Sequence, residues 1–298
     1  MDLAYLRANP HVIPRLIEHQ RIRVSSLSRD PAAAGQSQLW TLDDGTHLFA
    51  KAHAAAPSGF FAAEAAGLRW LAERPGLPVP EVIAVLDELL VLQWIQPGQP
   101  TRSGAQRLGE LLAQLHSFGA APAFGAPKGY GVPETGYVGV LPLDNTPKKE
   151  WPEFFLERRC LPYLRQARDL GVVDRKLCGE LETLLARLPQ HVGPSERPSR
   201  IHGDLWSGNV HYDAEGQPWI VDAAAAHWGH RETDLATLQL FGAPFLADTL
   251  NSYQAVYPLG EGWQQRVAAH QLHLLLVHVV VFGAGYVEQA LRAARTLR

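Results

Sequence analysis

The stretch from residue 201 to residue 222 constrains this chain more than any other part of the sequence. It contains IHGDLWSGN at residues 201–209 and, after a turn, IVD at residues 220–222. The intervening DAEG at residues 213–216 predicts a hairpin turn between two short hydrophobic strands. Such a hairpin would bring Asp222 beside the loop that carries Asp204 and Asn209. The sequence therefore predicts two carboxylates and one amide gathered at a single site.

Asp204, Asn209 and Asp222 have the chemistry that phosphoryl transfer requires. That reaction needs a carboxylate to orient and deprotonate the attacking hydroxyl, and oxygen ligands to hold Mg²⁺ against the phosphates. Kinase catalytic loops begin with His-x-Asp, carry an Asn five residues after the Asp, and precede a metal-binding Asp. An ordinary turn would explain either Asp alone. All three together favour Asp204 as the base and Asn209 and Asp222 as Mg²⁺ ligands.

The first hundred residues predict a small sheet that binds a nucleotide. Ranges 22–24, 38–42 and 47–52 have strand patterns, and range 60–74 has a helical one. Lys51 stands where kinases carry the third-strand Lys that holds the α- and β-phosphates. Glu64 lies on the apolar stripe of the helix, where an unpaired charge is unfavourable, so we expect Lys51 as its partner. Without the IHGDLWSGN run, both would be interpreted as ordinary surface charges.

Two further segments are candidates for contact with ATP. The small-residue loop DPAAAGQS at residues 30–37, which includes Gly35, would let backbone N–H groups approach phosphate oxygens. A flexible hairpin loop explains it equally well. The strand predicted at 89–95 ends before Pro97-Gly98, and backbone groups of Gln93, Trp94 and Ile95 could contact adenine at this hinge. Trp94 could equally be a core residue.

The remainder of the chain predicts mainly helices. Leu108, Leu111, Leu112 and Leu115 follow the helical template, and ranges 151–166 and 174–188 predict two more helices. Range 120–147 is rich in Gly and Pro and is interpreted as a loop on the substrate side. Range 272–286 predicts a buried helix, too short and too interrupted by His to cross a membrane.

Length and composition agree with a two-lobed enzyme. At 298 residues the chain exceeds one ordinary core, and we divide it into an N-lobe at 1–96 and a C-lobe at 97–298. A content of 46% hydrophobic and 19% charged residues indicates a folded chain. The net charge of −3 offers no broad footprint for nucleic acid.

Cysteine content and the N-terminus indicate where such an enzyme would work. Cys160 and Cys178 form no CxxC motif, so neither a disulfide framework nor a zinc site is suggested. The first residues lack the basic and apolar regions of a signal peptide. We therefore expect a cytoplasmic protein without membrane or nucleic-acid partners.

Motifs along nearly the whole chain resemble the fructosamine (ketosamine) kinase family, which belongs to the aminoglycoside-phosphotransferase-like kinases. They are GYG at 129–131, WPEFFLERR at 151–159, HGDLWSGN at 202–209, GHRETDLA at 229–236, LFG at 240–242 and FGAGY at 282–286. HGDLWSGN is specific, whereas HGD alone would indicate only the wider superfamily. The chain departs from the family at residues 223–228, where it has AAAAHW instead of Pro followed by a short run with aromatics.

The resemblance implies an α+β, bilobal protein-kinase-like fold, with a small antiparallel-sheet N-lobe containing one helix and a larger, mainly helical C-lobe. It also implies ATP and Mg²⁺ as cofactors and a small or protein-bound ketosamine as substrate. Phosphorylation of the sugar O3 would then lead to deglycation. The alternatives are another small-molecule kinase, of aminoglycoside or choline type, and a nucleotide-binding pseudokinase.

The resemblance suggests roles for several other residues. Asp234, with His202, would anchor the backbone of the catalytic loop rather than take part in the chemistry. Trp206 could wall the substrate pocket with its π-face or simply pack the loop. The run from His230 to Glu232 is a candidate for substrate contact, although Arg231 and Glu232 could equally pair locally.

Overall fold

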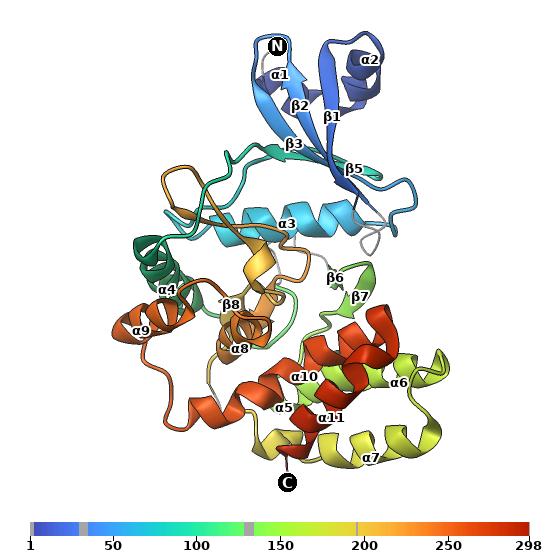
Figure 1. Cartoon of the computed structure of the whole chain (residues 1–298), viewed down its shortest axis with the longest axis vertical. Helices are drawn as coiled ribbons and strands as arrows, with labels where there is room; N and C mark the ends of the chain where they lie inside the picture. Colours follow the sequence, from blue (N-terminus) through green and yellow to red (C-terminus); the bar gives the residue numbers. More distant parts are fainter. Residues whose placement is uncertain (1–2, 30–34, 128–133, 195, 298) are drawn as a thin grey trace.

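The computed structural model describes residues 3–29, 35–127, 134–194 and 196–297. Figure 1 shows a strand-rich part, which holds the N-terminus, above a larger and mainly helical part. The GYG motif at residues 129–131 and most of the loop at 30–37 lie outside the described residues. The division of the chain at residue 96 stays a prediction.

The N-lobe is a five-stranded antiparallel sheet with the order β1-β2-β3-β5-β4. Its strands are β1 (Ile22–Arg29), β2 (Gln36–Leu42), β3 (His47–Ala52), β4 (Val82–Leu86) and β5 (Leu89–Gln93). Side chains alternate between its two faces, as the period-two pattern of a strand requires. Leu48 and Ala50 belong to a core on one face, whereas Phe49 packs with Leu92 on the other.

Two short helices that the sequence analysis did not predict cover the first face of the sheet. They are α1 (Leu3–Ala8) and α2 (Ile13–Glu18), joined by the single turn η1 (Pro10–Val12). Leu6 and Ile13 pack there against Trp40 and Leu42. Helices of six residues present too few apolar positions for a periodic pattern to be recognised.

The helix α3 (Phe60–Ala72) crosses the other face of the sheet and lies between the two parts of the molecule in Figure 1. Phe61, Ala65, Leu68 and Leu71, the apolar stripe of the sequence, are buried in a core that α3 shares with α4 (Arg102–Ser117). Helix α3 therefore packs in one core with strand β5 of the sheet and with helix α4 of the helical part.

The C-lobe contains most of the helices and a few short strand pairs. After α4, the helices are α5 (Trp151–Phe154), a π-helix (Phe155–Cys160), α6 (Leu161–Asp169), α7 (Arg175–Leu185), α8 (Glu232–Leu240), α9 (Leu246–Val256), α10 (Trp263–Phe282) and α11 (Val287–Arg295). Single turns occur at η3 (Leu188–Gln190), η4 (Ser207–Asn209) and η5 (Gly283–Tyr286). The paired strands are β6 (Thr135–Val138) with β7 (Leu141–Asp144), β8 (Ser199–Ile201) with β11 (His227–Gly229), and β9 (Val210–Tyr212) with β10 (Pro218–Ile220).

The hairpin β6–β7 corrects the interpretation of residues 120–147 as a loop. Gly and Pro mask its four-residue strands in the sequence, and its stability comes from tertiary contacts. Tyr137 donates its backbone N–H to Ala224 at 2.9 Å and its hydroxyl to the carbonyl of Ser58 at 2.8 Å. Its ring packs edge-on against Phe60. The hairpin thus joins the C-lobe to the start of α3.

The apolar helix near the C-terminus is longer than predicted. By length and composition, the segment Trp263–Arg295 could cross a membrane, and half of its most apolar window is buried within the protein. The expectation that it is too short was therefore wrong. The predicted burial is observed, since Leu272, Leu275 and Leu276 belong to the C-lobe core. The core helix of a soluble protein meets the same criteria.

The helix α3 is docked closely on the chain that follows Asp222. A Cβ atom at Gly67 would lie only 1.9 Å from the carbonyl oxygen of Ala223. The small side chains of residues 223–226 are all buried next to this contact. The AAAAHW segment thus begins at a tight backbone contact with helix α3.

Arg200 of β8 binds the C-terminal end of α3. Its guanidinium is buried, donates to the backbone carbonyl of Trp70, and lies 3.1 Å from the carboxylate of Glu73. It also lies 4.4 Å from the centre of the Trp70 ring. The strand β8 leads directly into the catalytic loop, so α3 and that loop share one rigid support.

Gly67→Ala should destabilise the protein despite the better helix propensity of Ala. A backbone carbonyl cannot yield as a flexible side chain can, so overpacking should cost about 1–3 kcal/mol, more than the roughly 1 kcal/mol gained from propensity. Thermal or urea unfolding would measure the difference. Gly179→Ala in α7, where a Cβ meets nothing within 4 Å, is the matched control and should be neutral or stabilising. Equal stability of the two variants would contradict the tight docking.

Candidate active site

A cavity of about 410 Å³ lies between the sheet and the catalytic loop. Its apolar walls are formed by Leu27, Phe49, Pro80, Leu92 and Val221. The hinge residues Gln93, Trp94, Ile95 and Pro97 form one edge, and Lys51, Glu64, Asn209, His211 and Asp222 form its polar part. An apolar slot that ends in charged groups suits a ligand with a flat ring at one end and anionic groups at the other.

Lys51 supplies the positive charge of this cavity. Its Nζ lies 2.7 Å from Oε1 of Glu64 and 3.2 Å from Oδ2 of Asp222. Burial alone would lower the pKa of Lys51, but the charges of Asp222 and Glu64 outweigh it and raise this pKa. Lys51 therefore remains a cation, held in place by one carboxylate from α3 and one from the catalytic segment.

The two carboxylates beside Lys51 have different surroundings. The Glu64 side chain is 1% exposed, and burial raises its pKa against the attraction of Lys51. The Asp222 side chain is 48% exposed, and the charge of Lys51 overcomes the effect of burial to lower its pKa. Asp222 is thus the carboxylate that remains ionised and accessible for a cation.

Asp222 also has an unusual backbone conformation. Its φ of +62° lies in the left-handed region, which residues other than Gly rarely adopt. Such strain persists only where surrounding contacts impose it, and it is concentrated at functional sites. Here the neighbouring Val221 donates its N–H to the carbonyl of Asn209 at 3.1 Å and accepts from Nε2 of His202 at 2.8 Å. These contacts fix the direction of the Asp222 side chain.

The backbone of the catalytic loop is tied to Asp234 on α8. The two carboxylate oxygens of Asp234 accept from the backbone N–H groups of His202 and Gly203, at 2.8 and 2.9 Å. Nε2 of His116 lies 3.2 Å from the same carboxylate, and its Nδ1 lies 2.9 Å from the Tyr253 hydroxyl. These are the contacts that the expected anchoring role of Asp234 requires, and they give His116 a structural place.

Asn209 closes the loop that begins at Asp204. Its side-chain amide donates to the backbone carbonyl of Asp204 at 2.8 Å. The amide nitrogen is therefore occupied, and the oxygen is the atom that can bind a cation. An amide oxygen together with the carboxylate of Asp222 is a donor set that fits Mg²⁺.

Asp204 differs from the other two aspartates because no cation or amide among the described residues lowers its pKa. Burial raises its pKa well above the usual range, and the charges of Asp222 and Asp234 raise it further. A carboxylate with a raised pKa is a better proton acceptor once it is ionised. The electrostatics thus distinguish Asp204, as a possible base, from Asp222, as a possible metal ligand.

The sequence predicted the charged residues and the hinge of the cavity, but fewer than half of the residues that line it. Seven predicted residues line it: Lys51, Glu64, Gln93, Trp94, Ile95, Asn209 and Asp222. Gly35 is not among the lining residues, and residues 30–34 are outside the described ranges, so the phosphate loop stays a prediction. Phe49 was missed, although it lies two residues from Lys51 and so on the same face of β3. Ser37, the last residue of the predicted small-residue loop, does line the cavity, whereas His211 was missed and no sequence signal marked it.

The structure does not support a substrate role for Arg231. Its side chain is buried and makes two hydrogen bonds to the carboxylate of Glu196, at 2.7 and 2.9 Å. It also donates to the carbonyl of Tyr257 at 3.1 Å and lies 3.9 Å from the centre of that ring. These bonds occupy the guanidinium, so Arg231 is a buried structural cation.

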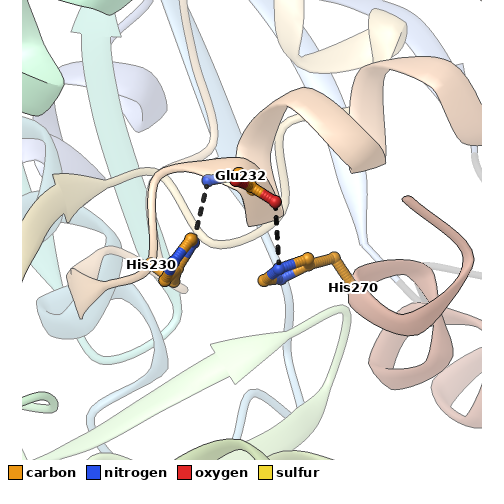
Figure 2. Close-up of side chains that lie close together, drawn as sticks. All are labelled: His230, Glu232 and His270. Atoms are coloured by element: carbon orange, nitrogen blue, oxygen red, sulfur yellow. Dashed lines mark hydrogen bonds and ion pairs between the residues drawn. The ribbon is translucent and has the colours of Figure 1, made fainter. Parts of the chain in front are cut away.

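His230 and Glu232 are likewise buried and are not among the residues that line the cavity. Nδ1 of His230 lies 3.3 Å from the backbone nitrogen of Glu232, and a carboxylate oxygen of Glu232 lies 3.6 Å from Nε2 of His270 (Figure 2). Burial, together with the nearby arginines, lowers the pKa of His230 to about 3, so its imidazole is neutral. The substrate role expected for these residues is withdrawn.

The same three side chains also have the composition of a metal site. His230, Glu232 and His270 each place a possible ligand atom within 4.8 Å of the others. However, Arg266 donates to both oxygens of Glu232, at 2.6 and 2.9 Å. Because this guanidinium neutralises the carboxylate and would repel a metal ion, we interpret the group as a buried ion-pair network.

Comparison with known proteins shows the family to which this chain belongs. The family model described as fructosamine kinase matches residues 12–297 of the chain. The chain belongs to the fructosamine kinase family. The resemblance found in the sequence motifs is therefore confirmed.

Individual members of the fructosamine kinase family are similar to this chain in sequence and in structure. A "probable ketoamine kinase" from Enterococcus faecium is 35% identical over 245 residues, which cover 81% of this chain and 84% of that protein. The crystal structure of a "putative fructosamine-3-kinase" from Thermobifida fusca is 42% identical, with a TM-score of 0.85 and coverage of 96% and 98%. The chain is thus a phosphotransferase of this family.

A more distant structure defines the fold class. A thermostable mutant of aminoglycoside phosphotransferase APH(4)-Ia, in a ternary complex with ADP and hygromycin B, has a TM-score of 0.61. It is 15% identical, and the match covers 96% of this chain and 98% of that one. At this identity the similarity concerns the fold alone. The predicted bilobal α+β kinase-like fold is confirmed.

Lys51→Met and Glu64→Gln should affect one function, because Glu64 contacts Lys51 at 2.7 Å and would act on a nucleotide in the cavity only through it. Loss of a charged hydrogen bond worth about 1.5–3 kcal/mol should lower kcat/KM for ATP about 10- to 100-fold in Lys51→Met, and less in Glu64→Gln. The double variant should be no worse than Lys51→Met alone. Steady-state kinetics would show this, with Glu110→Gln, an exposed ion-pair partner of Arg107, as control. Fully additive losses would show that the two residues act independently.

Proposed function

We propose that this protein is an ATP- and Mg²⁺-dependent ketosamine kinase that transfers the γ-phosphoryl group of ATP to the sugar O3. The observation that carries the proposal is the placement of Lys51 between Glu64 and Asp222, in a cavity bordered by the loop of Asp204 and Asn209. Membership of the fructosamine kinase family supports the sugar substrate. ADP in the complex of the distant phosphotransferase supports the nucleotide.

Each part of the cavity has a task in this proposal. The apolar slot holds adenine, and backbone groups near Gln93, Trp94 and Ile95 contact its edge. Lys51 binds the α- and β-phosphates, while Glu64 keeps its ammonium group in position. Asn209 and Asp222 hold Mg²⁺, which when bound neutralises charge on the phosphates.

Asp204 is the proposed base, two residues before Trp206 on the loop that carries Asn209. The carboxylate orients the O3 hydroxyl and accepts its proton as the oxygen attacks the γ-phosphorus. Asp234 and His202 keep the loop backbone fixed, so that Asp204 does not move as the charge changes. Fixed positioning is the main source of rate in a reaction of this kind.

Phosphorylation at O3 would make the ketosamine unstable. C1 carries the nitrogen and C2 the carbonyl, so enolisation toward C1 leaves the C3 phosphate in an allylic position. Elimination breaks the C3–O bond, phosphate leaves with the electron pair, and hydrolysis by water then releases the amine and a deoxy-dicarbonyl. We propose deglycation of small or protein-bound amines in the cytoplasm, and thus protein repair, as the outcome.

A panel of acceptors tests this function. Wild-type protein with Mg·ATP should phosphorylate ribulosamine or fructosamine in preference to an aminoglycoside or choline, and the ³¹P NMR signal of the product should decay as free amine appears. Asp204→Asn should lower kcat by about 10²-fold or more while ATP affinity changes little. A stable phosphorylated product, or preference for an aminoglycoside or choline, would overturn the ketosamine assignment. Binding of ATP without transfer to any acceptor would favour the pseudokinase.

The raised pKa of Asp204 predicts a loss of activity in mild acid. The base must be ionised to accept a proton, and a raised pKa means that it becomes protonated as the pH falls through a range well above that of an ordinary aspartate. The acid limb of kcat should therefore lie well above pH 4, the usual region for Asp, at about tenfold loss per pH unit below it. A pH profile at saturating ATP, Mg²⁺ and ketosamine measures it. Full activity maintained down to pH 4 would argue against Asp204 as the base.

A further inference from the structure

We infer that an exposed strip of aromatic side chains beside the catalytic loop binds the aglycone of the ketosamine, the group that its nitrogen carries in addition to the sugar. The aromatic strip consists of Trp206, Phe241, His278, Phe282 and Tyr286. This inference rests on the proposed function, because it assigns a site to the second half of that substrate. The strip would select apolar or aromatic aglycones.

The rings form a continuous chain of contacts across separate elements. Trp206, on the catalytic loop, meets Phe241 at the end of α8 with ring centres 6.3 Å apart and planes at 84°. Phe241 lies 5.0 Å from His278 of α10, which lies 5.2 Å from Phe282 and 4.9 Å from Tyr286. Edge-on and tilted arrangements at such distances are favourable for aromatic rings. Three segments far apart in the sequence thus build one surface.

The aromatic strip is open to solvent along much of its length. Trp206 is 40% exposed, Phe241 is 42% exposed and Phe282 is 51% exposed. Large apolar side chains that touch one another are usually buried, and an exposed contiguous group of them marks a binding surface. Packing of the protein alone therefore does not explain why these rings lie together at the surface.

The strip begins next to the reacting groups. Trp206 follows Asp204 by two residues, and its indole ring covers the backbone of Gly208. A Cβ atom at Gly208 would lie 2.2 Å from this ring, so only glycine permits the contact. Gly208 itself lines the proposed nucleotide cavity. A substrate whose hydroxyl approaches Asp204 would thus have its remaining part within reach of the strip.

The chemistry of the strip selects the occupant. Burial lowers the pKa of His278 and outweighs the opposite effect of the Leu274 carbonyl, which lies 2.6 Å from Nδ1, so the imidazole is a neutral ring near pH 7. The other four side chains carry no charge. Aromatic faces attract both apolar groups and an ammonium group. A ketosamine nitrogen bearing an apolar or aromatic chain offers both, whereas a carboxylate or phosphate on the aglycone would find no positive charge among these five side chains.

Two ketosamines of the same sugar test the inference. One is made from methylamine and the other from phenethylamine, and kcat/KM is measured for both. Burial of the phenyl group on the strip should give the wild type a preference of about 10- to 100-fold for the phenethylamine adduct. Phe282→Ala and Phe241→Ala should each reduce this ratio several-fold, mainly through KM. Tyr5→Ala, which removes a 49% exposed aromatic ring on α1, should keep the wild-type ratio.

The outcomes separate this inference from the proposed function. Transfer to both ketosamines with a wild-type ratio near one, or an unchanged ratio in both strip variants with native melting temperatures, would overturn the strip alone. A strip that instead joins two copies of the chain would show a change in sedimentation in Phe282→Ala with no change in the ratio, which also overturns it. Absence of transfer to either ketosamine would overturn the proposed function, and the aglycone site with it.

Discussion

The burial of Glu64 is the constraint on which the rest of the active site depends. A carboxylate that is 1% exposed must have a cation, and Lys51 on the neighbouring strand supplies it at 2.7 Å. This single ion pair fixes α3 relative to β3 and leaves the ammonium group facing the cavity. Asp222, from the other lobe, reaches the same ammonium at 3.2 Å. The ammonium group of Lys51 thus holds together strand β3, helix α3 and the segment of Asp222, which are distant in the sequence.

The packing around α3 keeps this ion pair assembled. Gly67 lies against the backbone of Ala223, Arg200 binds the carbonyl at Trp70, and Tyr137 binds the carbonyl at Ser58 near the start of the helix. The helix is thus attached to the C-lobe along its whole length. A helix held in this way cannot swing outward without losing several buried contacts. The alanines at 223–226 fit this arrangement, since larger side chains would separate the helix from the site.

Site residues could be predicted from the sequence where the proposed function requires a fixed spacing between them. They could not be predicted where contacts between distant segments determine which side chains meet. Asp204, Asn209 and Asp222 could be found because a hairpin of fixed length links them, and Lys51 could be found from its strand. The partners of Arg231 and Glu232 could not, because Glu196 and Arg266 lie about 35 residues away in opposite directions. The same holds for the aromatic strip, which unites the LFG and FGAGY motifs only through the packing of α8 against α10.

Charge explains how three neighbouring aspartates could perform the three different tasks that we propose for them. Burial opposes ionisation of each, but Asp222 has Lys51, and Asp234 has His116 and two backbone amides, so both have lowered pKa values. In the part of the chain that the structure describes, Asp204 has no such partner, and burial together with its two ionised neighbours raises its pKa. A cation bound at Asp222 would weaken one of these repulsions, and so favour the ionised form of Asp204 when metal and nucleotide are in place. The same electrostatics that assemble the nucleotide site would then prepare the base.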